Sequence, residues 1–384
     1  MNFKRILAVT SREARGMVRD KLFFAMAFIV PALLMLTFGY GLSLDVMHSP
    51  LAALDYDRTS MSRDYLHRFM DSPAFSFRGY LKSERQIYPL LASGTVRAVL
   101  IIPEHFQQNL LAGRPAAVQT LIDGTFPFRA QTVKGYVAAI NNSFNLRELS
   151  LYLCRTRAMS RRRALAGLEP IKAQVRCLYN RNLRSDWSIA PRLMMMVMMI
   201  CPPFLTAMGV VREKETGAIY NIYSSTITRG EYLLGKLTPY VVVSIFNAVV
   251  LWLIATEVFG APFRGGRLFF FASSVLYVIC TTGMGLIVSV LVGTQVAASL
   301  VTFIVTVVPT VFYSGMFVPI SSLSPSGRVV ARLLPAMYFT NIVSGCFLKG
   351  VGFKVLWSDA AVLAIYAAAL FMLGYSRFHK RPAS

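Results

Sequence analysis

The stretch LFFAMAFIVPALLMLTFGYGLSL, residues 22–44, decides the fold of this chain. It carries no charged residue and exceeds the roughly 20 apolar residues that a helix needs to cross a bilayer. It is too long for the apolar region of a typical signal peptide, and no small-residue cleavage site follows it. We therefore expect a permanent first membrane span.

Five more apolar runs follow and set the fold class. They cover Leu193–Val211, Leu237–Phe259, Leu268–Val292, Val296–Ile320 and Val355–Tyr375. The 384 residues are 55% hydrophobic and only 15% charged, whereas a soluble domain carries roughly 25% charged residues. The net charge of +22 suits nucleic acid or an anionic membrane surface, and the apolar runs favour membrane lipid, with no nucleic acid. The sequence predicts a polytopic α-helical membrane protein with six transmembrane helices.

The polar stretch between the first and second spans, residues 45–188, is long enough to form a domain. Short apolar runs at Leu51–Asp55, Arg97–Ile102 and Ala117–Asp123 are typical of strands, and helical patterns lie between them. The pattern from Gln131 to about Leu168 indicates one long or broken helix. We expect an inserted α+β domain with a helical stalk that returns to the membrane.

Basic residues beside the spans predict the topology. Residues 1–21 place apolar and basic side chains on different faces of a helix, which is typical of an amphipathic helix in the membrane interface. The loop at 212–236 and the tail at 376–384 are also basic. With six spans these three segments fall on one side, so both termini are expected in the cytoplasm, although Arg264 and Arg267 would then lie outside.

The remaining parts follow from this topology. The inserted domain at 45–188 becomes extracytoplasmic, and residues 189–375 form a five-helix transmembrane domain. Residues 319–350 are too polar and too broken for a full span. We expect this outer segment to be half buried in the outer leaflet.

No catalytic or metal-binding constellation stands out. The four histidines lack the spacing of metal ligands. Gly230–Leu237 has the spacing of a phosphate-binding loop, but Leu237 replaces the hydroxyl residue that would bind magnesium. If the protein uses ATP, another chain must bind it. Cys154 and Cys177 form a candidate disulfide in an oxidising compartment, and two unpaired thiols are an equal alternative.

The loop after the second span is the most informative segment. Alternating charges open it, and a short helix with an apolar face formed by Ile219, Ile222 and Tyr223 follows. Such a helix between two spans can dock into a groove on a soluble partner. The alternative is an ordinary charged loop.

Here the sequence resembles the ABC-2 type permeases of ATP-binding-cassette exporters, in the drug-efflux-like branch with a large extracytoplasmic loop. The signature after the second span matches at Arg212-Glu213-Lys214-Glu215-Thr216-Gly217 and at Gly235-Lys236. Further matches lie at Ser314-Gly315-Met316-Phe317-Val318-Pro319-Ile320 and, in the insert, at Asp55-Tyr56-Asp57-Arg58-Thr59-Ser60. Tyr220 and the pair Pro191-Arg192 depart from the family pattern.

The resemblance implies specific partners and roles. ATP and magnesium would bind a partner ATPase, and this chain would pair with a second permease copy or a paralogue. A periplasmic adaptor of the membrane-fusion type is a further partner that it implies. The residues expected to couple the ATPase to the spans are Arg212, Glu213, Lys214, Glu215, Thr216, Gly217, Ile219, Tyr220, Tyr223, Gly235 and Lys236.

A second set of residues is a candidate for the transport pathway or its gate. Met195 and Met199 are flexible, polarizable side chains that suit varied apolar cargo, although ordinary packing is the simpler interpretation. Pro309 implies a kink or hinge. The remaining members come from the second family match: Ser314, Gly315, Phe317 and Pro319.

The sequence thus predicts the permease subunit of an ATP-driven exporter for a lipophilic or amphipathic substrate. One alternative is an ion-coupled secondary exporter, which usually places carboxylates near the midplane of the membrane. Asp359 and Glu257 instead lie near predicted span ends. The other alternative is a membrane-anchored binding or assembly protein, for which five spans after the insert are excessive.

Overall fold

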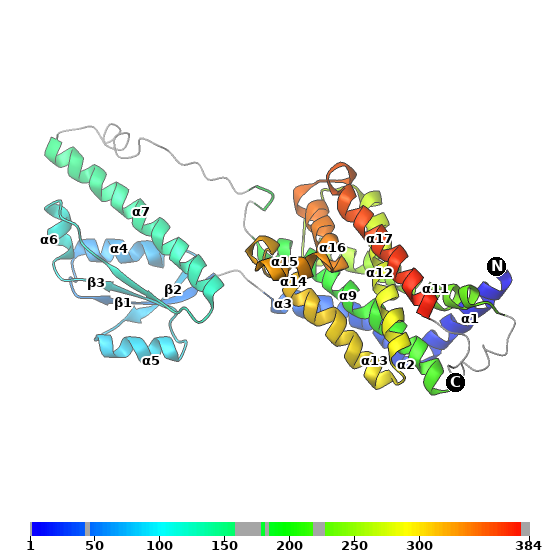
Figure 1. Cartoon of the computed structure of the whole chain (residues 1–384). Coiled ribbons are helices and arrows are strands. Elements are labelled where there is room, and N and C mark those ends of the chain that lie inside the picture. Colours follow the sequence, from blue (N-terminus) through cyan, green and yellow to red (C-terminus); the bar gives the residue numbers. More distant parts are fainter. Residues whose placement is uncertain (1, 43–46, 158–177, 181–183, 218–226, 378–384) are drawn as a thin grey trace. The chain divides into compact units, whose positions relative to one another are not determined.

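The computed structural model describes residues 2–42, 47–157, 178–180, 184–217 and 227–377. The chain divides into two compact units (Figure 1). One unit, here called the membrane unit, combines Met1–Ser43 with Cys177–Ser384. The other unit, here called the sheet domain, comprises Leu44–Arg176.

The membrane unit contains six helices that are long and apolar enough to cross a bilayer, which confirms the predicted fold class. The first span joins α2 (Lys21–Phe24), the π-helix η1 (Ala25–Ile29) and α3 (Val30–Gly41). The next three are α9 (Ser185–Glu215), α11 (Arg229–Leu253) with η3 (Ile254–Val258), and α12 (Arg267–Leu291). The fifth joins α13 (Gln295–Thr302), η4 (Phe303–Val307) and α14 (Val308–Tyr313), and the sixth is α17 (Phe353–Arg377).

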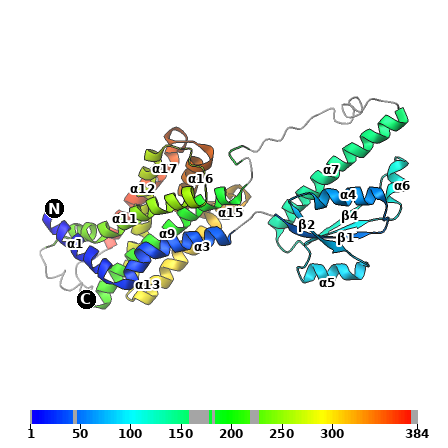
Figure 2. The ribbon, with the colours of Figure 1, turned by 180° about the vertical axis from the view of Figure 1, so that it is seen from behind.

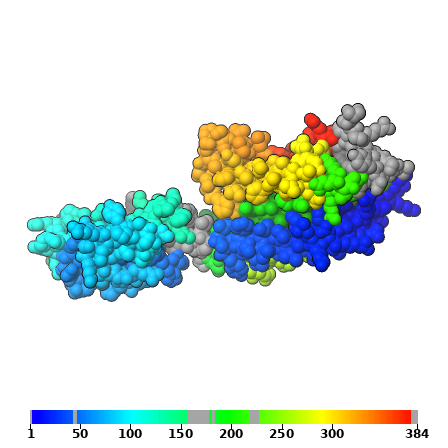
Figure 3. Space-filling view, turned by 90° about the horizontal axis from the view of Figure 1, so that it is seen from below, coloured from blue at the N-terminus to red at the C-terminus, as the bar shows by residue number. Residues whose placement is uncertain are grey.

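Helix α9 is the centre of the membrane unit. In its most apolar stretch of 18 residues, 83% of the stretch is buried within the protein. The corresponding share is 17–61% for the other five spans. It contacts α3, α11, α12 and α13 (Figure 2). On the face seen in Figure 3, the blue N-terminal helices and the yellow α13 lie on either side of the green α9. A movement of α9 therefore has to involve most of its neighbours.

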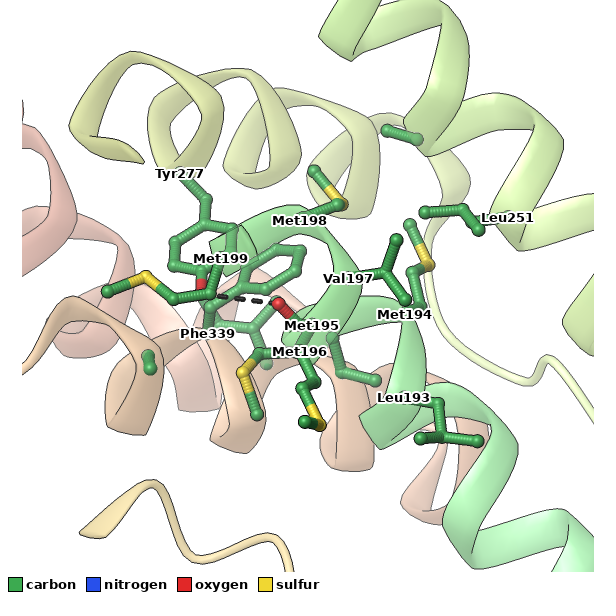
Figure 4. Packing of buried hydrophobic residues seen from close by; sticks show 14 of the residues in the cluster. Leu193, Met194, Met195, Met196, Val197, Met198, Met199, Leu251, Tyr277 and Phe339 are labelled. Carbon is green, nitrogen blue, oxygen red and sulfur yellow. Dashed lines mark hydrogen bonds between the residues drawn. The ribbon is translucent and has the colours of Figure 1, made fainter. Parts of the chain in front are cut away.

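The methionine-rich turns of α9 fill the core of this bundle (Figure 4). Met195 and Met199 are completely buried. The Tyr277 hydroxyl donates to the backbone carbonyl of Met195 at 3.4 Å, and the Tyr277 ring stacks on Phe339 with centroids 4.2 Å apart. Packing between helices of one copy accounts for the position of these methionines.

The segment after the fifth span turns back into the bundle. The fifth helix ends at Tyr313, earlier than the sequence pattern indicates, and Gly315 then adopts a left-handed φ of +80°. Two helices follow, α15 (Pro325–Arg332) and α16 (Pro335–Ser344), and α16 continues into the π-helix η6 (Gly345–Lys349). The chain bends by 85° between α15, the first arm, and the continuous helix of α16 and η6, the second arm. The second arm packs against α9, α12 and α17.

The sheet domain is a four-stranded mixed sheet with strand order β2-β1-β3-β4. Its strands are β1 (Ser49–Asp55), β2 (Phe75–Tyr80), β3 (Ala98–Ile102) and β4 (Gln119–Ile122). Strand β1 pairs in parallel with β2 and β3, whereas β4 is antiparallel to β3. Strand β2 was absent from the sequence prediction because its sequence FSFRGY contains an arginine and a glycine and it lies at the sheet edge.

Helices cover both faces of this sheet. The long ones on one face are α4 (Ser60–Met70) and α7 (Pro127–Arg157), whose Phe69 and Val137 join the core under β1 and β3. Helix α5 (Ile87–Ala92) covers the other face (Figure 1). The 3-10 turn η2 (Glu84–Gln86) and the short helix α6 (Phe106–Leu111) complete the domain.

Candidate functional site

The N-terminal helix α1 (Phe3–Arg19) is docked along α11. A Cβ atom built on Gly235 would lie 2.9 Å from the backbone oxygen of Ile6, so only glycine permits this approach. The Thr10 hydroxyl donates to the Gly235 carbonyl at 3.1 Å. Phe3 and Leu7 remain exposed on the outer face of α1. Helix α1 therefore belongs to the helix bundle, and its place in the membrane interface stays a prediction.

The charged residues at the end of α9 each reach a different element. Consecutive helical residues point about 100° apart, so one turn can contact neighbours on all sides. The Arg212 guanidinium lies 2.6 Å from an Asp20 carboxylate oxygen, and Asp20 caps the N-terminus of α2. The Lys214 ammonium donates to the backbone carbonyls of Ser289 and Val292, where α12 ends.

The next acidic residue on α9 completes this set of contacts. A Glu215 carboxylate oxygen accepts the backbone N–H of Gln295 at 2.7 Å, at the start of α13.

The Asp20 carboxylate has a pKa below its usual value because the backbone N–H groups of Phe23 and Leu22 and the Arg212 guanidinium stabilise its charged form.

A buried ion pair lies at the centre of this arrangement. The Lys236 ammonium is 2.6 Å from a Glu13 carboxylate oxygen and 3.1 Å from a Glu213 carboxylate oxygen. Only 2% of the Lys236 side chain is exposed. The hydroxyls of Tyr240 and Tyr232 donate to Glu13 and Glu213, respectively. Three helices, α1, α9 and α11, are thus joined through one ammonium group.

We call this set of side chains the charged junction, and its end of the membrane unit the α1 end. Its members are Glu13, Asp20, Arg212, Glu213, Lys214, Glu215 and Lys236. Beside it lies a cavity of about 280 Å³ whose lining includes Arg12, Gly16 and Thr216. The structure therefore brings together, in one site, charged residues from Arg212–Gly217 and from the pair Gly235-Lys236, which are the two parts of the sequence signature.

The signature ends where α9 ends. Thr216 is the C-cap residue, and Gly217 has φ +70°, the left-handed conformation that closes many helices. Ile219, Tyr220 and Tyr223 lie outside the described residues, so their coupling role stays a prediction.

The phosphate-loop-like segment Gly230–Leu237 is helical. It lies within α11, which begins with a capping box between Thr228 and Glu231. The segment starts in the first turn of α11, where the Glu231 N–H donates to the Thr228 hydroxyl at 3.4 Å. The Lys236 ammonium contacts two carboxylates, so it is not available to a phosphate. Within the parts of the chain that the structure describes, no three His, Cys, Asp or Glu side chains are grouped to hold a metal ion.

The candidate pathway residues are divided between two environments. Ser314, Gly315 and Pro319 line a cavity of about 450 Å³ at the opposite end of the unit, here called the α16 end. Met195 and Met199 are buried and line no part of that cavity. The remaining two residues are Pro309, which opens α14, and Phe317, which is 42% exposed.

The candidate disulfide stays a prediction as well. Cys154 is half-buried on α7, and Cys177 lies outside the described residues.

Several residues of the junction were missed by the sequence reasoning. Glu13 and Asp20 are the only acidic residues among the first 21, and that isolation within a basic helix is a signal that could have found them. Tyr232 and Tyr240 carry no such signal, because tyrosines are common in apolar helices near the membrane surface.

Comparison with known proteins shows the family of the chain. A family model described as "ABC-2 family transporter protein" matches residues 21–376. YbhS of Escherichia coli strain K12, described as a "Probable multidrug ABC transporter permease", is 29% identical over 376 residues, which cover 97% of this chain and 96% of the relative. YbhR of the same strain has the same description and is 24% identical over 383 residues, 99% of both chains. YhhJ, an "Inner membrane transport permease", is 24% identical over 384 residues, 99% of this chain and 98% of the relative.

Proposed function

The chain belongs to the ABC-2 transporter family, and from that premise we propose that it is the transmembrane permease subunit of an ATP-driven exporter in the bacterial inner membrane. Subunits of this kind lack ATPase activity and imply an ATPase partner. In our proposal that partner binds ATP and magnesium. The observation that carries the proposal is the charged junction, which joins α1, α9 and α11 beside the short loop that would face the ATPase.

The proposed orientation places the charged junction in the cytoplasm. The basic N-terminal helix, the basic residues of Arg212–Lys236 and the end of α17 at Arg377 all belong to the α1 end. The positive-inside rule assigns such an end to the cytoplasm. The sheet domain, which follows the first span, would then be extracytoplasmic.

Coupling follows from the pattern of contacts. When the ATPase closes on ATP, it would displace the loop between α9 and α11. The end of α9 cannot move without displacing its neighbours, because Arg212, Glu213 and Lys214 each contact a different helix. The spans would reorient as a set, and the ATPase would have to bind the two arrangements with different affinity.

The substrate class is proposed from composition and relatives. The spans are rich in methionine and phenylalanine, which suits a lipophilic or amphipathic cargo. Two of the relatives are described as probable multidrug permeases. We propose efflux of such compounds through a dimer of this chain with a second copy or a paralogue, with a periplasmic adaptor of the membrane-fusion type as a further partner.

Co-purification with a candidate ABC ATPase partner tests the proposal. We expect vanadate-sensitive ATP hydrolysis in the complex and efflux of hydrophobic compounds from a deletion strain that regains both genes. Glu215→Ala and Gly217→Ala should abolish efflux without preventing membrane insertion, because they loosen the end of α9. Gly266→Ala is a matched control, since its Cβ would meet nothing within 4 Å. If both variants export as the wild type does at equal expression, the coupling assignment is wrong.

A further inference from the structure

A second charge that is withdrawn from solvent, but only half-buried, lies at the α16 end of the membrane unit. Arg192 is half-buried in the second turn of α9. A 31-residue helix is about 46 Å long, whereas the apolar core of a bilayer is about 30 Å thick. Arg192 therefore lies near the boundary of the apolar layer, where an arginine can meet the charged group of an amphipathic molecule.

Arg192 is held by neutral groups only. Its Nη1 donates to the backbone carbonyl of Met316 at 3.0 Å, and its Nε donates to the Ser344 hydroxyl at 3.4 Å. Among the described residues, no carboxylate lies within ion-pair distance of this guanidinium. Outside them the chain has only two acidic residues, Asp45 and Glu169. A charge placed here without a partner is costly, which indicates a functional reason for it.

The cavity beside Arg192 has the size and chemistry of a binding site. Its volume of about 450 Å³ falls in the range of small-molecule pockets. It is lined by a second cation, Lys349, and by polar side chains that include Thr340 and Asn341, and its described lining contains no acidic residue. Leu348 and Ile320 form an apolar part of the cavity wall. Two cations, neutral polar groups and apolar wall match a molecule with an anionic head and an apolar body.

The part of the cavity wall that holds Arg192 is shaped by contacts within the chain. The left-handed Gly315 and the Ser314 hydroxyl, which accepts the Met316 N–H at 3.3 Å, shape the turn whose carbonyl holds Arg192. Ser344 comes from α16, which packs against α9, α12 and α17. The guanidinium is therefore oriented before any ligand arrives, which lowers the entropic cost of binding.

We propose that the cavity around Arg192 binds the anionic head group, a carboxylate, phosphate or sulfate, of an amphipathic molecule. Arg192 pairs with the head through its remaining N–H groups, since a guanidinium can bind such oxyanions in a bidentate manner. Binding itself is independent of the ATPase, and only the identification of the ligand as exported cargo rests on the proposed function.

Radiolabelled dodecyl phosphate is a suitable probe. The full chain in phosphatidylcholine nanodiscs should retain it above the level of empty nanodiscs, and should bind dodecyltrimethylammonium, which has the same tail, no better than empty nanodiscs do. Arg192→Gln should weaken binding roughly 10- to 100-fold, as expected for lost charge-assisted hydrogen bonds. The affinity of Arg192→Lys for dodecyl phosphate should lie between those of the wild type and Arg192→Gln. Arg267→Gln is the matched control, because Arg267 lies over Trp252 and outside the cavity lining.

A second arm identifies the source of the anion. Part of the phosphatidylcholine is replaced with phosphatidylglycerol. Displacement of the probe from the wild type would assign the site to a lipid head group, whereas unchanged binding would assign it to a free amphipathic anion such as exported cargo. Both results support the site.

Two results overturn the proposal. One is equal affinity of the wild type and a correctly folded Arg192→Gln for dodecyl phosphate. The other is equal retention of the phosphate and ammonium probes by the wild type, and this comparison stays decisive even if the glutamine variant does not fold. Neither result bears on ATP-driven export, which is tested with the ATPase present.

Discussion

At the α1 end of the membrane unit, the buried Lys236 contacts two carboxylates, whereas at the α16 end the half-buried Arg192 contacts a carbonyl and a hydroxyl. Both side chains project from spans of the same bundle. A buried charge that is fully paired mainly fixes the arrangement of the helices around it, while an unpaired one is available to a ligand. The comparison separates a structural linkage at one end from a binding site at the other.

The largest effect is expected from Lys236→Met. This change removes the cation shared by Glu13 and Glu213, whose side chains are only 15% and 12% exposed, while Arg12 stays 3.8 Å from Glu213. Breaking a buried pair costs about 3–5 kcal/mol, which is the upper bound here. We expect low expression and a strongly lowered thermal unfolding midpoint in detergent. Lys354→Met is the control, because Lys354 is exposed at the other end of the unit. Equal unfolding midpoints for the two variants would show that Lys236 is not a structural linkage, and the contrast with Arg192 would then be wrong.

Gly235→Ala should have the next largest effect. Its new methyl group would lie 2.9 Å from the backbone oxygen of Ile6 and 2.7 Å from Cβ of Val9, so α1 has to move away from α11. Overpacking of this kind costs about 1–3 kcal/mol. Thermal unfolding and protease access to α1 measure it. Gly16→Ala serves as the control on α1 itself, since nothing lies within 4 Å of its Cβ position. Docking of α1 is refuted if both variants behave as wild type.

Thr228→Ala should have a smaller effect at the same end. Thr228 caps α11, and loss of such a cap costs about 1 kcal/mol. Among the described residues, the Thr238 hydroxyl bonds only to the carbonyl of Leu234 in its own helix. Thr238→Ala should therefore leave the unfolding midpoint close to that of the wild type. A loss from Thr228→Ala as large as that from Lys236→Met would mean that helix capping, and not charge pairing, holds this end together.

Arg192→Met should change stability least. Removing an unpaired charge relieves its desolvation, which offsets the two hydrogen bonds that are lost. We expect a net change below about 1 kcal/mol by thermal unfolding. A loss comparable to that of Lys236→Met would show that Arg192 has a structural role similar to that of Lys236.

The parts of this fold that depend on local pattern could be predicted from the sequence. Apolar runs of bilayer length give the six spans, and alternating or short apolar runs give β1, β3 and β4. Strand β2 was not predicted because an edge strand needs few apolar residues. Pairing between distant residues, such as Lys236 with Glu13, carries no local signal and depends on how α1 docks.

The site was predictable only in part for the same reason. The signature residues Glu213, Gly235 and Lys236 were identified by resemblance, whereas the structure supplies their contacts. Arg192 was noticed as a departure from the family pattern at the start of the second span. Its importance depends on the turn at Gly315 and on α16, which fold back from more than a hundred residues later in the chain.

A double-mutant cycle between Glu213 and Lys236 tests the central claim most directly. Glu213→Gln, Lys236→Met and the double variant are compared in thermal unfolding and in vanadate-sensitive ATP hydrolysis by the complex with the ATPase. If the charged junction links the helices that the ATPase moves, the double variant will be clearly less impaired than the sum of the single variants in both measurements. Additive losses in both would contradict the account.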